Sequence, residues 1–373
     1  MKNPSDLRPL SVHSINRREF GQRLIALGLV PMLAVVPSRV RAATVTLEDV
    51  RNASGQLNVL GSQVYEVPST YPKGVSVKYA YNVTNEEIIT KTTQPGTFDL
   101  VVIYQGEIDQ LRKLDRITPI DTGLIENWGK IGSLFRNSEV IRRGSDVYAV
   151  PYQWGHSYLE YNSDEMGEPK GFEDLMSPKL TKKVGLPDDP YAVISTFAVF
   201  AGAKRPNNLN SSEFDKTIKL LKSFRPQVLT IHAYGEEPPL FARRDIYVGF
   251  PEFSSSIVAA KKAGAANMKF SLLAAWSYVD CLMLLKRANN VAAAYAYMNN
   301  SLSDASQMAI TAHSQAFPVN DAAIKALPEQ LQYKSSDEVL ARAPLLPGVT
   351  VEKNTSDVPF QQWVRAWEEF KAS

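Results

Sequence analysis

The side chains that could carry out chemistry are few and scattered in this chain. Three of its four histidines, His156, His232 and His313, lie beyond the first 42 residues, and their spacing places no two on one helical face. Zinc chemistry would need His-Glu-x-x-His or clustered Cys and His, and a nucleophilic serine would need Gly-x-Ser-x-Gly; neither string occurs. Asp188 and Asp189 could form an acid–base pair, but adjacent residues on a turn rarely converge on one substrate. We therefore expect no enzyme, no catalytic residue, no metal ligands and no cofactor.

One apolar stretch holds both an acid and the single cysteine. Asp280 and Cys281 lie between Val279 and Leu282. One cysteine cannot form an intramolecular disulfide, and in this context we expect a small buried hydrophobic side chain. A lone aspartate among apolar residues is either a structural acid, paired with the backbone or an arginine, or an acid that meets a ligand. The residues alone leave both interpretations open.

The elements that position these residues follow an α/β pattern. Short β-branched runs alternate with helical stretches, as in βαβ units with mainly parallel sheets. A chain of 373 residues exceeds the ~250–300 residues at which single cores stop growing, so two lobes are expected. The segments 147–155 and 276–285 read as extended. We also predict strands over 57–60, 75–81, 98–103, 158–161, 183–186 and 246–250, and helices over 85–92, 108–114, 192–201, 213–223, 254–263, 291–299, 304–312 and 359–371.

The first 42 residues predict export. Arg17 and Arg18 are followed by Phe20, by a short apolar run over 24–36 and by small residues before Ala43, as in a secretory signal. The paired arginines resemble the twin-arginine export motif, and the alternative is a general secretory signal that contains Arg-Arg. These residues carry seven Lys or Arg and two acids, so the remainder has a net charge of about −3. We expect a periplasmic protein without attraction to nucleic acid.

A series of segments resembles the spermidine/putrescine-binding branch of the extracytoplasmic solute-binding proteins of ABC transporters. The most diagnostic is Val-Pro-Tyr-x-Trp-Gly over 150–155, and the whole series covers nearly all of 55–370. The other carriers are Phe-Asp-Leu-Val-Val (98–102), Ile-Asp-Gln-Leu-Arg-Lys (108–113), Ile-x-x-Ile-Asp (117–121), Leu-Pro-Asp-Asp (186–189), Tyr-Val-Asp (278–280) and Phe-Pro-Val-Asn (317–320).

The resemblance implies a fold and a function. The fold would be an α/β, two-lobed periplasmic binding protein (a type II clamshell) with two hinge crossings, preceded by a signal peptide. Lobe 1 would comprise 43–150 and 281–320, and lobe 2 would comprise 151–280 and 321–373. The protein would act as a monomer that binds a small cationic amine, such as a polyamine, between the lobes and delivers it to an ABC permease.

The resemblance also implies ligand contacts. Asp280 matches the family's acid between the lobes, with Tyr278 at the aromatic position two residues earlier, and Asp189 matches an acid at the opposite end of the ligand. Phe253, or its neighbour Glu252, falls where the family has an aromatic wall. Three further candidates are Tyr104, after the 98–103 strand, Trp276, which alternates with Tyr278, and Ser62, at the end of the first strand.

Two departures from the family pattern bear on the ligand. Ala192 stands where the family has a second acid three residues after Asp189, and Gly61-Ser62-Gln63-Val64 replaces Trp-Thr-x-Tyr. A shorter diamine or another amine therefore suits the chain better than spermidine. A ferric-ion receptor of the same superfamily is one alternative, although such receptors often use an adjacent tyrosine pair and the 16 tyrosines here include none. An exported hydrolase is the other alternative.

Overall fold

The structure, a computed structural model, describes residues 45–81, 85–327, 332, 334–340, 343 and 357–373. The predicted signal peptide, residues 1–42, lies outside the described residues. No helix in the described part combines the length and the apolar character that crossing a membrane requires.

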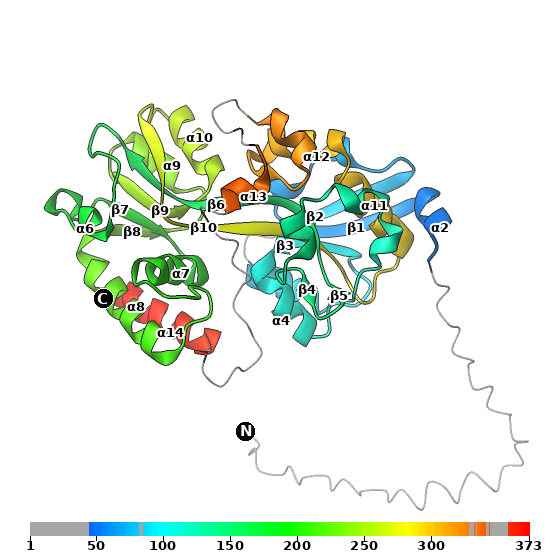
Figure 1. Cartoon of the computed structure of the whole chain (residues 1–373), viewed down its shortest axis with the longest axis horizontal. Helices are drawn as coiled ribbons and strands as arrows, with labels where there is room; N and C mark the ends of the chain where they lie inside the picture. Colours follow the sequence, from blue (N-terminus) through cyan, green and yellow to red (C-terminus); the bar gives the residue numbers. More distant parts are fainter. Residues whose placement is uncertain (1–44, 82–84, 328–331, 333, 341–342, 344–356) are drawn as a thin grey trace, which may run out of the picture. The chain divides into compact units, whose positions relative to one another are not determined.

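One mixed sheet runs through the described chain (Figure 1). Its strands follow the order β2-β1-β3-β10-β6-β9-β7-β8, with β11 paired to β6. The pairs β1–β2, β1–β3, β7–β8 and β7–β9 are parallel, whereas β10 and β6 run antiparallel to each other at the centre. The strands are β1 (Gly55–Gly61), β2 (Val75–Tyr81), β3 (Leu100–Tyr104), β6 (Val150–Asn162), β7 (Val184–Pro187), β8 (Val228–His232), β9 (Val248–Glu252), β10 (Met268–Leu284) and β11 (Phe317–Pro318), with the separate hairpin β4 (Arg142–Arg143) and β5 (Asp146–Val147).

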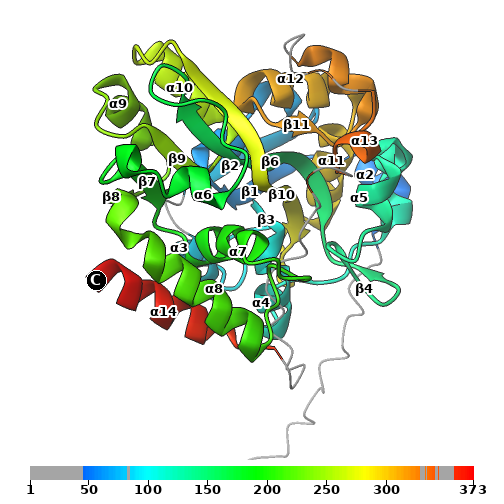
Figure 2. The ribbon, with the colours of Figure 1, turned by 60° about the vertical axis from the view of Figure 1, so that its left-hand side comes forward.

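Helices cover both faces of this sheet. In the part built on β7, β8 and β9, the helices α7, α8 and α14 lie on one face and α9 and α10 on the other (Figure 2). The helices are α2 (Leu47–Arg51), α3 (Asn85–Lys91), α4 (Ile108–Lys113), α5 (Ser133–Asn137), α6 (Phe172–Leu175), α7 (Pro190–Phe200), α8 (Ser211–Phe224), α9 (Glu237–Ala242), α10 (Ser254–Lys262), α11 (Val291–Ser301), α12 (Asp304–Ser314), α13 (Ser336–Leu340) and α14 (Phe360–Ala372).

Two large hydrophobic cores divide the molecule into two lobes. Core 1 takes residues from β1, β3, α11 and the first part of β6, and core 2 takes residues from β7, α7, α8, β9 and α14. Among the described residues, β6 and β10 supply buried residues to both of these cores: Trp154 and Val279 pack in core 1, and Leu159 and Trp276 pack in core 2, while Tyr104 at the end of β3 is partly buried against both. We call the part around core 1 lobe 1 and the part around core 2 lobe 2. The paired stretches 153–158 of β6 and 277–280 of β10, over which these strands pass from one core to the other, are called the crossing.

The structure confirms the predicted fold class and modifies details. The predicted strand 158–161 is the continuation of the extended segment before it, so β6 is one strand of 13 residues. The predicted lobe 2 included 321–373, but Ile324, Leu327 and Leu340 pack in core 1, so this part of the chain belongs with lobe 1. Within the predicted lobe 2, α14 does pack in core 2. Cys281 is buried, as expected.

Candidate functional site

The crossing places Asp280 at the centre of the sheet, between the two lobes. In the strand register Asp280 is the partner of Tyr104 on β3 and of Gln153 on β6. Its side chain is buried, with the residue 3% exposed, and one carboxylate oxygen, Oδ2, accepts a hydrogen bond from Gln153 Nε2 at 2.9 Å. The hydroxyl of Tyr65, in the 3-10 turn that follows β1, donates a second hydrogen bond to the carboxylate.

The surroundings of Asp280 leave its charge without a cationic partner. Within the described part of the chain, no ion pair joins Asp280 to a lysine, arginine or histidine. Burial raises the pKa of its carboxyl from 3.8 to about 6, because the two neutral hydrogen-bond donors offset only part of the lost hydration. A cation placed beside a carboxylate in this setting would stabilise its charged form.

Aromatic rings form a wall beside this carboxylate. Tyr278 lies two residues before Asp280 on β10, so both side chains project from the same face of the strand. Its ring packs edge-on against Phe253, with centroids 4.8 Å apart, and Phe253 packs against Tyr234 at 4.9 Å. A Cβ atom on Gly155, the register partner of Tyr278, would lie 2.6 Å from the Tyr278 hydroxyl. Glycine at 155 is therefore what lets the Tyr278 ring lie across the crossing.

Further contacts between the lobes lie beside this wall. We call Asp280, the aromatic rings and these contacts together the seam. Tyr104, which follows core 1 residues of β3, packs its ring against Tyr191 of α7 at 5.7 Å. Asp189 caps the start of α7: its Oδ1 accepts from the Ala192 amide at 2.9 Å, and Pro190 occupies the first helical turn. Its other oxygen, Oδ2, accepts from the Tyr234 hydroxyl at 3.1 Å. One oxygen of Asp189 is thus committed to the helix, and the other faces an exposed tyrosine.

The structure brings five of the eight predicted ligand residues to this seam. Asp280 is buried, while Tyr278, Phe253, Tyr104 and Asp189 are partly exposed.

Three of the eight candidates lie elsewhere. Trp276 is a core 2 residue whose indole Nε1 donates to Thr196 Oγ1 at 3.0 Å. Ser62 lies at the end of β1 and starts the 3-10 turn that carries Tyr65, and its backbone oxygen accepts from the Tyr65 amide at 3.0 Å. Glu252 points away from its neighbour Phe253, because successive strand residues face opposite sides, and it joins a separate buried cluster.

Sequence reasoning did not select Gln153, Tyr191, Tyr65 and Tyr234 as residues of the seam. Tyr65 follows Gly61-Ser62-Gln63-Val64 by one position, so the tyrosine of the family pattern is present but displaced by one residue. Tyr234 follows β8, a short strand that the sequence pattern did not reveal. Tyr65 could have been recognised from its short distance in sequence from the end of β1, whereas no feature of the sequence pattern indicated Tyr234.

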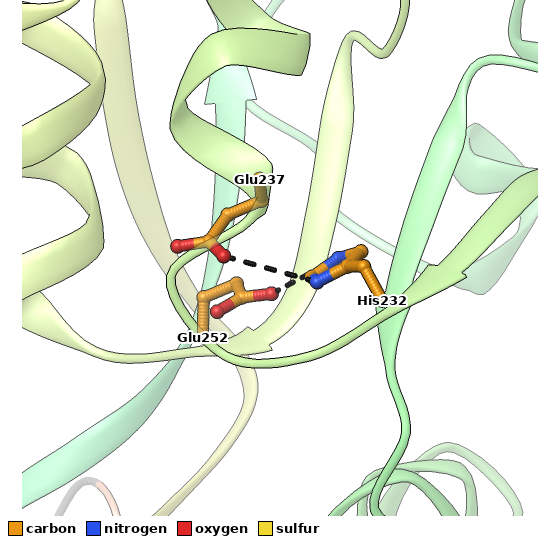
Figure 3. Close-up of side chains that lie close together, drawn as sticks. All are labelled: His232, Glu237 and Glu252. Atoms are coloured by element: carbon orange, nitrogen blue, oxygen red, sulfur yellow. Dashed lines mark ion pairs between the residues drawn. The ribbon is translucent and has the colours of Figure 1, made fainter.

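The separate cluster consists of His232, Glu237 and Glu252 (Figure 3). These come from the end of β8, the start of α9 and the end of β9, and their side chains point toward one another. Burial, followed by the charges of Glu237 and Glu160, raises the pKa of the Glu252 carboxyl well above its usual value. Two pockets among the described residues are in other places, one between 92–98, 114–116 and 285–287 and one between 201–203 and 212–216.

The geometry defines a class before any comparison with known proteins. Two α/β lobes share two central strands, and an acid and a set of aromatic rings meet where those strands cross. This is the construction of a hinged binding protein. Residues 73–341 match the family described as bacterial extracellular solute-binding proteins, and the chain belongs to that family.

Individual relatives and structures agree with this assignment. The spermidine/putrescine-binding periplasmic protein of Salmonella typhimurium is 24% identical over 238 residues, which cover 62% of this chain and 66% of that protein. The putrescine-binding periplasmic protein of Pseudomonas aeruginosa is 25% identical over 269 residues, covering 65% and 72%. The spermidine/putrescine ABC transporter substrate-binding protein of Streptococcus pneumoniae, solved with calcium and HEPES, superposes with a TM-score of 0.72 at 21% identity, covering 86% of this chain and 99% of that one.

These comparisons confirm the predicted family resemblance and the two-lobed fold. The matched proteins are solute-binding transport proteins and not enzymes, which confirms the prediction that this chain is not an enzyme. Membership of an extracellular family also supports an exported location. The aligned part spans 66% of the length of the Salmonella relative, so that relative's ligands are not transferred to this chain by similarity alone.

Proposed function

We propose that this protein is a periplasmic receptor that binds a small cationic amine between its lobes and delivers it to an ABC permease. The observation that carries the proposal is Asp280, a buried carboxylate at the crossing whose partners are the neutral side chains of Gln153 and Tyr65. An ammonium group would supply the charge that this carboxylate lacks. The names of the relatives from Salmonella and Pseudomonas, which bind spermidine or putrescine, support the same ligand class.

The aromatic wall supports an amine rather than a metal ion as the ligand of the seam. Tyr278, Phe253 and Tyr104 offer ring faces and edges, and rings contact methylene chains and attract cations by about 0.5–2 kcal/mol each. A ferric ion would instead require oxygen ligands that converge on one point, and these rings pack on one another. The acid and the wall together fit a chain of methylenes that ends in an ammonium group.

The second acid limits the length and charge of this ligand. Asp189 lies in lobe 2, holds the α7 amide with one oxygen and the Tyr234 hydroxyl with the other, and has Ala192 where the family places another acid. One carboxylate at each end accommodates one ammonium group at each end. We therefore propose a short diamine, represented by putrescine, in preference to spermidine.

The test is a binding titration of the full chain with a matched series of ligands. Putrescine, spermidine, butylamine and the uncharged 1,4-butanediol separate charge from length, and Fe³⁺ tests the iron alternative. We expect putrescine to bind most tightly and butanediol not to bind. A ligand at a hundredfold excess over its Kd stabilises the folded protein by about 2.7 kcal/mol, which a thermal melt detects readily.

Two variants locate the site. Asp280→Asn should weaken putrescine binding by more than about tenfold, because the buried carboxylate is replaced by a neutral isostere. Asp146→Asn, an exposed acid on β5, is the matched control and should bind as the unmodified chain does. Equal affinity of butanediol and putrescine, or an unchanged affinity in Asp280→Asn, would remove the basis for an amine receptor.

Export by the twin-arginine route, a monomeric state and delivery to a permease belong to the same proposal. Replacing Arg17 and Arg18 by lysine should block export if the route is twin-arginine, and should leave it intact if the signal is a general secretory one. Native mass spectrometry with and without putrescine would report the oligomeric state.

A further inference from the structure

The cluster of His232, Glu237 and Glu252 is a buried group of acids and imidazole that the amine site does not use. The three ligand-type atoms lie within 4.8 Å of one another, and the residues are 5%, 1% and 1% exposed. His232 and Glu252 are the last residues of two strands that run parallel to β7, so both stand at the carboxyl-terminal edge of this part of the sheet. In α/β folds that edge is where ligands bind.

The hydrogen bonds leave two acceptor atoms facing each other. His232 Nδ1 lies 3.1 Å from the backbone oxygen of Ala233, so the tautomer that donates this hydrogen bond carries a lone pair on Nε2. That Nε2 has no hydrogen-bond partner, and neither does Glu252 Oε1, which lies 3.5 Å away. Two buried lone pairs at this distance are unfavourable unless a positive charge lies between them.

Glycine residues clear the space in which the two side chains meet. The strand β7 lies between β8 and β9, and a Cβ atom on its Gly185 would lie 3.1 Å from His232 Nε2. A Cβ atom on Gly249 would lie 3.5 Å from Glu252 Cγ. Without a side chain at 185, His232 reaches over the intervening strand toward Glu252.

Apart from the imidazole of His232, which lies 3.8 Å from Glu237 and 3.5 Å from Glu252, the acids of the cluster have no basic partner among the described residues. Glu160 of β6 lies close enough to interact electrostatically with Glu237 and Glu252; its Oε2 accepts from Ser256 Oγ at 2.9 Å, and its Oε1 has no partner. Among the described residues, no lysine or arginine forms an ion pair with any of these three glutamates. Buried carboxylates without a cation are costly, and both protons and metal ions can remove the cost.

From this geometry we propose that His232, Glu237 and Glu252 bind a divalent first-row transition-metal ion inside lobe 2, with Glu160 beside them. Metal–ligand distances of about 2.0–2.2 Å in a tetrahedral site separate neighbouring ligand atoms by about 3.3–3.5 Å, which matches the spacing between His232 Nε2 and Glu252 Oε1. The contact from Nδ1 to a backbone carbonyl is the outer partner that metal-bound histidines usually have. An imidazole ligand favours Zn²⁺ and its neighbours over Mg²⁺ and Ca²⁺.

The site adjoins the amine seam without sharing its ligands. Phe253 follows Glu252 directly, and Tyr234 lies two residues after His232, so the ion would hold the ends of two strands that carry the aromatic wall. It is a second, structural site, and its occupancy does not depend on the identity of the amine.

The experiment measures zinc binding to the full, tag-free chain after metal has been stripped with a chelator. Zn²⁺ is titrated against a competing chelator, and bound metal is measured by elemental analysis after dialysis. We expect one Zn²⁺ per chain, and a loss of affinity of at least about tenfold in His232→Ala and in Glu252→Gln. His313→Ala, which removes an exposed histidine of α12, is the matched control and should bind as the unmodified chain does.

Further measurements distinguish loss of the metal site from loss of the fold and from an effect on amine binding. Glu252→Gln is nearly isosteric, and its melting curve without metal shows whether the fold survives. Gly185→Ala retains every ligand but crowds His232 Nε2, so it should also weaken Zn²⁺. Asp280→Asn should leave Zn²⁺ binding unchanged.

Three outcomes would overturn the metal site. The first is a stripped chain that holds no more Zn²⁺ than His232→Ala and Glu252→Gln do, which would mean that protons alone neutralise the cluster. The second is loss of the bound Zn²⁺ in His313→Ala. The third is displacement of Zn²⁺ by putrescine together with dependence on Asp280, which would place the ion at the seam.

Discussion

The surroundings of Asp280 favour the binding of a cation at the expense of the stability of the free protein. The carboxylate lies between two strands, accepts hydrogen bonds from Gln153 and Tyr65, and has no cationic partner in the described chain. Burial and the nearby Asp280 also raise the pKa values of Tyr65 and Tyr278, so both phenols stay neutral donors. The free protein therefore carries an electrostatic cost, which the proposed ammonium ligand would remove.

The pH dependence of binding follows from the pKa of about 6 for Asp280. Above that pH the carboxylate is charged and binds the amine; below it, a proton occupies the site and competes. We expect putrescine affinity to be constant above about pH 7 and to fall by about tenfold per pH unit well below 6, as measured by titration calorimetry. Asp280→Asn should lack this dependence, and an affinity that stays flat from pH 7 to pH 5 in the unmodified chain would contradict the role given to Asp280.

The same shift predicts the stability of the free protein. The folded-state pKa of Asp280 lies above its unfolded value of 3.8, so the folded state binds the proton more tightly, and stability falls as pH rises through this window. At pH 8 the buried charge costs about 3 kcal/mol, and Asp280→Asn should recover part of it, because Gln153 Oε1 is an unpaired acceptor for the new amide. Urea unfolding at pH 8 without ligand measures this, and a less stable Asp280→Asn would show that the carboxylate is structural.

At the scale of elements, β6 and β10 both connect the two lobes and carry residues of the candidate site. Among the described residues they supply buried side chains to both large cores, and they carry Gln153, Tyr278 and Asp280 where they pass from one lobe to the other. Gly155 matters both for the connection between the lobes and for the candidate site, because the absence of a side chain at 155 leaves room for the Tyr278 ring.

Gly155→Ala should therefore damage binding more than folding. The added methyl group would lie 2.6 Å from the Tyr278 hydroxyl, so the ring must move away from Phe253, and we expect putrescine affinity to fall by more than about tenfold. Gly167→Ala, where a Cβ atom meets nothing within 4 Å, is the control. Calorimetric titration of both variants provides the measurement, and equal affinities would show that Tyr278 does not line the site.

Sequence patterns predicted most elements, and the limits of those patterns explain what they missed. Alternation predicted β2 over Val75–Tyr81, and helical stretches at 192–201 and 304–312 predicted the helices that the structure shows as α7 and α12. α9 was missed because the helix contains consecutive prolines at 238 and 239, and β8 was also missed, although it is as long as the predicted strands β3 and β9.

The candidate site was predictable only where family motifs fix single positions. Asp280 and Tyr278 follow from Tyr-Val-Asp, whereas the choice between Glu252, the last residue of β9, and Phe253, which caps α10, depends on the side toward which each side chain points, and the resemblance did not decide that. The metal cluster draws on three elements, five and fifteen residues apart, so no local spacing could have marked it.

At the scale of the whole molecule, each lobe has its own core and contributes its own half of the seam. Tyr65 and Tyr104 come from lobe 1, Asp189 and Phe253 come from lobe 2, and Asp280 lies on a shared strand. A ligand that contacts both sets of residues binds more tightly to the conformation in which the two sets are together. The equilibrium shifts toward that conformation by the difference in the ligand's binding free energy between the two conformations.

Hydrogen exchange tests this view of closure on both lobes at once. With putrescine at a hundredfold excess over its Kd, amides at 104–105 in lobe 1, at 189–192 in lobe 2 and at 277–280 in the crossing should all exchange more slowly, because the bound amine joins them. Amides in the middle of α8 and α11, which lie away from the seam residues, should change less and provide the internal reference. Protection confined to lobe 1, with 189–192 unchanged, would mean that the amine binds one lobe alone, and Asp189 would then be only the cap of α7.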